Sequence, residues 1–320
     1  MSIAFVFPGQ GSQSIGMLSE LAAEHPTVAA TFAEASSALG SDLWNLVQRG
    51  PSESLNATER TQPAMLAAGI ACWRVWRERG GAVPSLVTGH SLGEFTALVA
   101  AEALPFADCI KLVAFRGRAM QEAVPVGTGA MAALLGLDDA DVVAACADAA
   151  REGGVAEAVN FNSPGQVVIA GDTDAVQRAI DAAKVRGAKR AVLLPVSVPS
   201  HSSLMRKAAE QLAVVLADLP FATPAIEFRS AVDGQRYAQP DAIRELLGRQ
   251  LMSPVQWTDT VRGLIDSGAT QILECGPGRV LVGLCQRIAR GTPTSCASLE
   301  TPPQFAAALA AAAPATTRNH

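Results

Sequence analysis

The segment Gly89-His90-Ser91-Leu92-Gly93 is the feature that most constrains how this chain can fold. It has the G-x-S-x-G pattern, in which a serine lies on a sharp turn from a strand into a helix. Residues 85–88 before it form a short apolar stretch, and residues 94–101 after it are typical of an apolar helix. The two glycines suit such a turn because the backbone around the serine is strained and crowded. The segment therefore predicts a strand-turn-helix unit that exposes the Ser91 hydroxyl group as a nucleophile.

The rest of the chain alternates strand-like and helix-like segments, which predicts an α/β architecture around a mostly parallel sheet. Within it, residues 127–198 follow the ferredoxin-like order βαββαβ. The expected elements are 130–135, 139–150, 156–160, 166–170, 174–184 and 191–196. We therefore expect a small ferredoxin-like subdomain at 127–198, inserted into a discontinuous large domain formed by 1–126 and 199–320. The alanine-rich segment after Pro302 is expected to be loosely held.

Composition excludes several classes of function. The formal net charge of −5 argues against nucleic acid as a general partner. The longest late apolar run, residues 305–313, has nine residues, whereas a bilayer requires roughly 20, so we expect no membrane partner. The six cysteines form no C-x-x-C pair. They indicate reduced thiols in a cytoplasmic protein and suggest no metal site.

One basic cluster stands out against this acidic balance. Lys184, Arg186, Lys189 and Arg190 place four positive charges within seven residues. One interpretation is a solvated helix C-terminus, where cations complement the helix dipole. The other is a docking patch for an acidic protein.

A serine nucleophile needs a base, and histidine is best matched to accept its proton near neutral pH. Of the four histidines, His320 is at the chain end and His25 is in a helix-forming segment. The His90 side chain should diverge from its neighbour on so sharp a turn. His201 remains, in a loop that returns from the predicted insert. Because no acidic residue stands out between Ser91 and His201, a neutral carbonyl group is an alternative orienting partner for the imidazole.

Arg116 is a cation in the middle of an apolar helix face. Residues 106–124 are predicted to form one helix, and its apolar residues gather on one side. These are Cys109, Leu112, Val113, Ala119 and Met120. A buried cation must meet an anion, either in an internal ion pair or in a ligand. Because arginine binds planar carboxylates through two parallel hydrogen bonds, the ligand interpretation predicts a substrate with a free carboxylate beside its acyl carbon.

A glycine-rich turn at residues 7–13 follows the first predicted strand. It lacks the third glycine of the dinucleotide fingerprint and the Gly-Lys-Ser/Thr ending of a P-loop. The segment is therefore either a plain turn or a turn whose backbone N–H groups donate hydrogen bonds to an oxyanion. In the second case, the N–H groups of Gln10 and Leu92 would share that oxyanion.

Taken together, these segments resemble the malonyl-CoA:acyl carrier protein transacylase family along nearly the whole chain. The similar segments are residues 7–13, 61–64, 89–94, 116–121, 127–131, 160–166, 199–201, 254–257 and 276–278. The resemblance implies an α/β-hydrolase-like large domain with a ferredoxin-like insert. It also implies that Ser91 is the nucleophile, His201 the base and then the acid, and Arg116 the clamp on the malonyl carboxylate. Gln10 and Leu92 would provide the oxyanion-hole amides.

The resemblance implies further residues around this centre. The backbone carbonyl of Gln256 is expected beside the His201 ring, as a neutral third member. Ser253 stands where the family pattern leads us to expect an asparagine. Gln62 and Asn162 are expected to support substrate binding.

The function implied is transfer of a malonyl group from malonyl-CoA to the phosphopantetheine thiol of acyl carrier protein, which feeds fatty acid biosynthesis. A malonyl-serine intermediate is expected, with no metal or redox cofactor, and we expect a monomer. Acyl carrier proteins are acidic, which favours the docking interpretation of the basic cluster. Two alternatives remain: a serine thioesterase or other hydrolase, and a non-catalytic module that binds the carrier protein.

Overall fold

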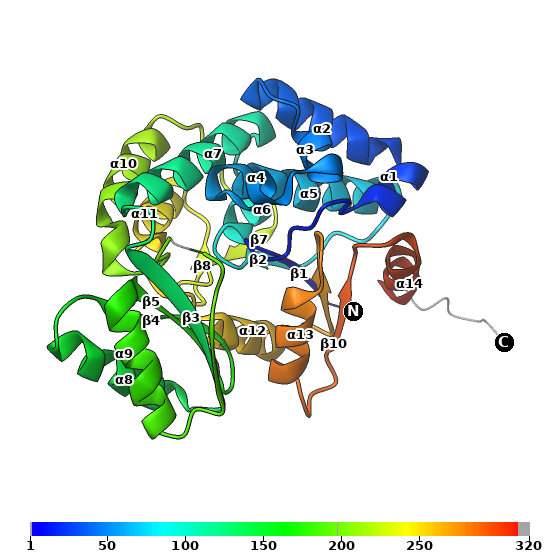
Figure 1. The fold of residues 1–320 in the computed structure, drawn as a ribbon. Helices are drawn as coiled ribbons and strands as arrows, with labels where there is room; N and C mark the ends of the chain where they lie inside the picture. The colour runs from blue at the N-terminus through cyan, green and yellow to red at the C-terminus, as the bar shows by residue number, and fades with distance from the viewer. Residues whose placement is uncertain (1, 197, 313–320) are drawn as a thin grey trace.

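A six-stranded, mostly parallel sheet forms the centre of the larger part of the molecule (Figure 1). The structure is a computed structural model that describes residues 2–196 and 198–312. The strands of this sheet are β1 (Ile3–Phe7), β2 (Leu86–Gly89), β7 (Glu227–Arg229), β8 (Arg236–Tyr237), β9 (Gln271–Glu274) and β10 (Ser295–Ser298). Their order is β10-β9-β1-β2-β7-β8, and only β8 runs antiparallel to its neighbour.

Helices cover both faces of this sheet because its central strands are apolar on both sides. In β1, Phe5 and Phe7 belong to one core, whereas Ala4 and Val6 belong to the other. Side chains alternate between the two faces of a strand, so this division follows directly from the sequence. The second core is closed by α12 (Trp257–Asp266) and α13 (Val280–Ile288).

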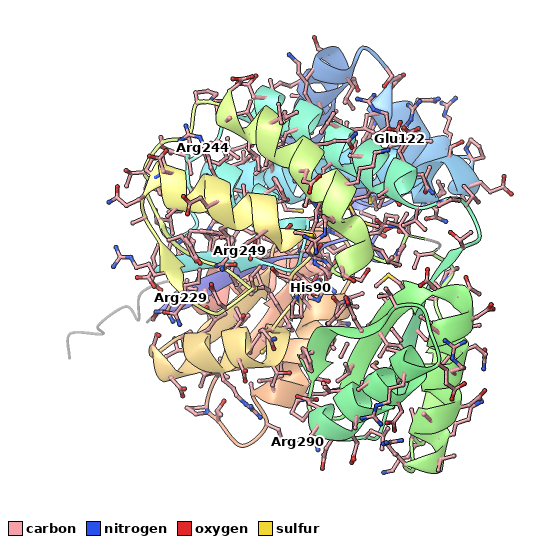
Figure 2. The ribbon with its side chains drawn as sticks, turned by 90° about the vertical axis from the view of Figure 1, so that its left-hand side faces the viewer. His90, Glu122, Arg229, Arg244, Arg249 and Arg290 are labelled. Carbon is pink, nitrogen blue, oxygen red and sulfur yellow. The ribbon has the colours of Figure 1, made fainter. Side chains whose placement is uncertain are left out.

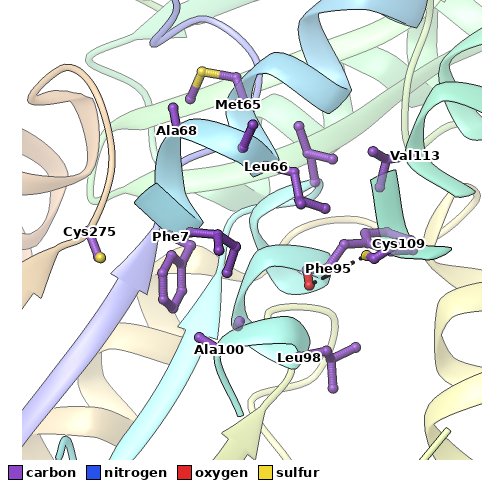
Figure 3. Packing of buried hydrophobic residues seen from close by; sticks show 14 of the residues in the cluster. Phe7, Met65, Leu66, Ala68, Phe95, Leu98, Ala100, Cys109, Val113 and Cys275 are labelled. Atoms are coloured by element: carbon purple, nitrogen blue, oxygen red, sulfur yellow. Dashed lines mark hydrogen bonds between the residues drawn. The ribbon is translucent and has the colours of Figure 1, made fainter. Parts of the chain in front are cut away.

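The larger core includes residues from most of the remaining helices. They are α1 (Ser19–Glu24), α2 (Pro26–Leu39), α3 (Leu43–Arg49), α4 (Ser52–Asn56), α5 (Thr58–Glu78), α6 (Gly93–Ala100), α7 (Phe106–Ala123), η1 (Ser203–Met205), α10 (Arg206–Ala217), α11 (Pro240–Gln250) and α14 (Pro302–Ala312). Figure 3 shows part of this core, which includes Phe7 of β1, Leu66 of α5 and Phe95 of α6. The Cys109 thiol donates to the Phe95 carbonyl over 3.8 Å. These contacts hold α6 and α7 in fixed positions relative to β1 and β2.

The smaller part is a four-stranded antiparallel sheet with two helices, shown in green in Figure 1. Its elements are β3 (Gly129–Leu135), α8 (Asp139–Arg151), β4 (Ala156–Ser163), β5 (Gln166–Asp172), α9 (Thr173–Val185) and β6 (Arg190–Leu193). The strand order β4-β5-β3-β6, antiparallel throughout, is that of a ferredoxin-like βαββαβ unit. The predicted fold class is therefore confirmed.

Some elements differ from the expectations at their ends. Strand β6 ends at Leu193, before the predicted end at residue 196, and β5 runs on to Asp172, beyond residue 170. Strand β4 continues to Ser163, beyond the predicted end at residue 160, and contains register shifts that let it bend.

The segment after Pro302 is not loosely held as far as residue 312, because it forms α14 with Phe305 buried against Trp76. Alanine favours the helix and Phe305 anchors it. Between residues 2 and 312, position 197 aside, no helix has the length and apolar character needed to cross a membrane.

Strand β4 joins the small sheet to the larger part. The N–H of Phe161 donates to the Val255 carbonyl over 2.9 Å, and the Val255 N–H donates to the Val159 carbonyl over 2.8 Å. On the same side, the Glu157 carboxylate accepts hydrogen bonds from the N–H and the hydroxyl group of Ser203. The two parts therefore meet through hydrogen bonds as well as packing.

Candidate active site

Ser91 lies on the predicted elbow, between the end of β2 at Gly89 and the start of α6 at Gly93. Its φ of 53° is in the left-handed region, which is strained for a residue with a side chain. A Cβ on Gly93 would lie 1.9 Å from the Phe7 carbonyl oxygen, and one on Gly89 would lie 1.9 Å from the Gly93 carbonyl carbon. At both positions the neighbouring backbone lies too close to leave room for a side chain, so glycine is required.

We expect Gly93→Ala to lower the free energy of unfolding by about 1–3 kcal/mol, because its methyl group overlaps the Phe7 carbonyl. Thermal or denaturant unfolding measures the effect. Gly283→Ala, in α13, is the matched control, since its new Cβ meets no described atom within 4 Å. That substitution should leave stability unchanged or raise it slightly. Equal destabilisation by both substitutions would contradict the packing explanation.

The His201 imidazole contacts the Ser91 hydroxyl group, with 2.7 Å between Nε2 and Oγ. Its Nδ1 lies 3.0 Å from the Gln250 carbonyl oxygen and 3.1 Å from that of Ser253. Carbonyl oxygens only accept, so Nδ1 carries the proton and Nε2 offers its lone pair to the serine. Burial, and next the positive charge of Arg116, lower the pKa of His201 to about 3. The imidazole is therefore neutral near pH 7 and able to take the Ser91 proton.

The prediction that Gln256 orients His201 is wrong. Gln256 is the N-cap residue of α12, and its carbonyl accepts hydrogen bonds from the N–H and hydroxyl group of Thr260. Its own N–H donates to the Ala231 carbonyl. The backbone of Gln256 is thus committed to starting a helix, and Gln250 and Ser253 supply the carbonyl groups at His201.

Sequence reasoning missed Gln250, although a signal for it exists. It ends α11 and lies on the buried face of that helix. The apolar positions that mark this face are Ile243, Leu246 and Leu247. A polar residue in register with such a stripe needs buried partners, which is the argument that singled out Arg116.

The Arg116 guanidinium group is buried, at 1% exposure, and faces the nucleophile from α7. Nη1 donates to the Gln62 side-chain oxygen over 2.8 Å. Nη2 donates to the Gln250 side-chain oxygen over 3.0 Å and to Ser91 Oγ over 3.2 Å. Burial lowers the pKa of Arg116 to about 9 and the charge of Glu94 opposes this, so the group is a cation near pH 7.

An internal ion pair, one of the two interpretations of Arg116, is not what the structure contains. Among residues 2–196 and 198–312, no ion pair includes Arg116. Within the same residues, its buried Nε–H finds no hydrogen-bond partner. A buried cation with neutral amide neighbours and a spare donor is suited to a ligand carboxylate.

A cavity of about 450 Å³ contains this cluster. The described residues that line it include Gln10, Gln62, Ser91, Leu92, Arg116 and His201. No backbone carbonyl of the described residues accepts a hydrogen bond from the N–H of Gln10 or Leu92. Both amides are therefore free to bind an oxyanion beside the serine.

Asn162 is not among the described residues that line the cavity, so its part in substrate binding stays a prediction. Its side-chain oxygen is 2.8 Å from Nε2 of His90, so the two side chains link the elbow to β4. Burial lowers the pKa of His90. Figure 2 shows His90 where the small sheet meets the larger part of the molecule. Asn160, which sequence reasoning did not select, lines the cavity, and its buried side-chain oxygen has no partner among the described residues.

The basic cluster is partly neutralised by its own chain. Lys184 pairs with Asp181 over 2.9 Å, and Arg186 pairs with Asp148. Lys189 and Arg190 are exposed, and no ion pair within the described part of the chain includes either of them.

His25 is not among the described residues that line the cavity. It is buried at the start of α2. His320 lies outside the described residues.

Comparison with known proteins gives consistent matches along the chain. A family model described as an acyl transferase domain matches residues 4–301. The chain is 55% identical to the malonyl CoA-acyl carrier protein transacylase of Escherichia coli K12, over 96% of this chain and 98% of that protein. The Bacillus subtilis protein of the same name is 42% identical, over 92% of this chain and 93% of its own length.

Solved structures agree with these matches. One is a malonyl-transacylase in complex with a type II PKS acyl-carrier protein, with a TM-score of 0.95 and 53% identity, over 97% of this chain and 100% of that chain. Another is the malonyl CoA-acyl carrier protein transacylase of Coxiella burnetii. It has a TM-score of 0.95 and 46% identity, over 97% of each chain.

Proposed function

Because this chain belongs to the acyl transferase domain family, we propose that it transfers a malonyl group from malonyl-CoA to the phosphopantetheine thiol of an acyl carrier protein. The observation that supports this most strongly is the environment of the Ser91 hydroxyl group. In one cavity it contacts both a neutral buried imidazole and a buried guanidinium cation. The first activates a nucleophile and the second selects an acyl group that ends in a carboxylate.

In the first half-reaction, His201 takes the Ser91 proton as Oγ attacks the thioester carbonyl of malonyl-CoA. The N–H groups of Gln10 and Leu92 stabilise the oxyanion of the tetrahedral intermediate. The C–S bond then breaks, and His201 returns the proton to the CoA thiolate. The product is a malonyl ester of Ser91, whose carboxylate is held by Arg116.

In the second half-reaction, the carrier thiol gives its proton to His201 and attacks the ester carbonyl. Collapse of the second tetrahedral intermediate breaks the C–O bond, and Ser91 recovers the proton. The product is malonyl-carrier protein, a precursor for fatty acid biosynthesis. Every step is acyl or proton transfer, so the proposal requires no metal or redox cofactor.

The experiment that tests this function is mass spectrometry of the protein after brief exposure to malonyl-CoA, followed by separate addition of buffer or holo-acyl carrier protein. We expect a malonyl adduct on Ser91 that persists in buffer and is discharged by the carrier. Rapid discharge in buffer alone would indicate the hydrolase alternative. Carrier binding with no adduct would indicate the non-catalytic module.

We further propose that Lys189 and Arg190 bind the acidic carrier. Strand β6, which contains Arg190, leads to Leu194 and Pro195 at the cavity wall, so this patch lies along a route to Ser91. Reversing both charges to glutamate is expected to raise the KM for carrier protein while leaving acylation by malonyl-CoA unchanged.

The matched control reverses Lys111 and Arg118, which are exposed on α7. It changes the net charge equally and should leave the carrier KM nearly unaffected. Slower acylation by the Lys189 and Arg190 variant, or an equal effect of the control, would contradict the docking proposal.

The compartment we propose is the cytoplasm. This rests on the six cysteines, which are all free thiols and mostly buried. Burial raises the pKa of Cys296 to about 11, so even this half-buried thiol stays protonated and unreactive.

A further inference from the structure

Glu94 is a buried carboxylic acid that the proposed reaction does not use. It lies in the first turn of α6, three residues after the nucleophile, and has no exposed surface. Its carboxylate accepts hydrogen bonds from the Ser230 hydroxyl group over 2.7 Å, the Ala231 N–H, and the Gln250 side-chain amide over 2.6 Å. Burying a carboxylate is unfavourable without such partners, so its presence next to Ser91 requires a reason.

The contact with Gln250 determines which way that amide points. The Gln250 Nε2 group donates to Glu94 and also to the Ser91 carbonyl over 3.0 Å. Both are acceptors, so the NH₂ group must face them and the amide oxygen must face Arg116, 3.0 Å from Nη2. In the reversed orientation, the amide NH₂ group would face the guanidinium N–H groups, donor against donor. Glu94 thus determines, through one amide, where Arg116 finds its acceptor.

Glu94 also places a negative charge near the Arg116 guanidinium group, with the Gln250 side-chain amide between them. The charged groups that face it are Arg116 from α7 and Asp233 from the loop after β7. Burial raises the pKa of Glu94 to about 7, and its three hydrogen bonds oppose that rise. The carboxylate is therefore ionised above about pH 7 and becomes neutral as the pH falls below it.

We propose that Glu94 is a positioning residue for Arg116: acting through Gln250, it aims the guanidinium group across Ser91 and balances its charge without occupying its carboxylate-binding donors. The preference for acyl groups that end in a carboxylate then depends on a side chain that never touches them. This inference rests on the proposed function. A missing malonyl adduct on the parent protein would overturn that function first, before any Glu94 variant is measured.

The test compares acylation of the parent protein and Glu94→Gln by malonyl-CoA and acetyl-CoA between pH 6 and pH 9. A glutamine presents a second NH₂ group to Gln250, so the amide loses its fixed direction. We expect the ratio of kcat/KM for malonyl to that for acetyl to fall about tenfold or more, the size typical when a hydrogen bond to a charged group is lost. In the parent protein, malonyl transfer should weaken below about pH 7 and acetyl transfer should not. The variant should lack this inflection.

A second variant keeps the carboxylate and shifts its titration. Ser230→Ala removes a hydrogen bond that lowers the pKa of Glu94. The malonyl inflection should therefore move to higher pH, while the acetyl profile stays unchanged. This readout does not require Glu94→Gln to fold. A profile that does not move would overturn the proposal.

Two controls separate positioning from simple loss of structure. Glu274 is also fully buried, and its carboxylate accepts the N–H groups of Leu281 and Val282 at the start of α13. Glu274→Gln should reduce stability and leave the malonyl-to-acetyl ratio unchanged. Adding Glu94→Gln to Arg116→Ala should change that ratio no further, because the two residues act as one unit. Equal loss for both acyl groups in Glu94→Gln, or a changed ratio in Glu274→Gln, would overturn the proposal.

Discussion

Replacing Ser91 with alanine is expected to abolish the acyl-enzyme and reduce kcat for transfer by about 10⁴-fold or more. The alanine variant keeps the elbow and the cavity but has no oxygen to carry the malonyl group between the two thiols. Intact-protein mass spectrometry after exposure to malonyl-CoA and a steady-state transfer assay measure the two effects.

The matched control for this prediction is Ser200→Ala, which changes another serine in the cavity wall. Among the residues that the structure describes, the Ser200 hydroxyl group bonds only the Val198 carbonyl of its own segment. This variant should keep the adduct and most of the transfer rate. A malonyl adduct on the Ser91→Ala protein, at whatever residue, would show that Ser91 is not the nucleophile.

Replacing Arg116 with alanine is expected to reduce malonyl transfer far more than acetyl transfer. Loss of a buried charge pair with a ligand weakens binding by about 2–5 kcal/mol, equivalent to roughly 30-fold to several thousandfold. The acetyl group has no carboxylate, so it has no such interaction to lose. The measurement is kcat/KM for acylation of Ser91 by malonyl-CoA and by acetyl-CoA.

Arg118→Ala, on the exposed side of the same helix, controls for the loss of an arginine. It should change neither value appreciably. A similar loss for malonyl and acetyl in Arg116→Ala would contradict the role of the guanidinium group as a carboxylate clamp. Arg116→Lys should recover only part of the preference, because an ammonium group cannot form the two-pronged contact.

The fold was predictable because its elements have strong local patterns. The helix expected at 106–124 is α7, Phe106–Ala123, and the six elements of the small sheet occur in the expected order. The errors lie at ends of elements. β4 runs on to Ser163 because it pairs with β5 and bridges to Val255, and neither partner is visible from the segment itself.

The candidate site likewise contains residues that the sequence predicted correctly and one that it did not. Ser91, His201 and Arg116 each had a local signal, namely an elbow, elimination among four histidines, and a cation on an apolar face. The prediction that the Gln256 carbonyl orients His201 was wrong because every residue has a backbone carbonyl group. Which of these groups points toward His201 depends on how the chain folds. Gln250 lies at the end of one helix and Gln256 at the start of the next, so the turn between them decides which carbonyl reaches His201.

The hydrogen-bonded junction at β4 has a consequence for the range of acyl groups the cavity can accept. Arg116, from α7, lines the cavity, and so do Met131 and Leu194, from the small sheet and the segment that leaves it. The hydrogen bonds of the junction hold together, close to the nucleophile, the two parts that carry these residues. The width of the acyl chamber thus depends on the seam between the two sheets. Substitutions in the small sheet could enlarge or narrow that chamber while the elbow stays untouched.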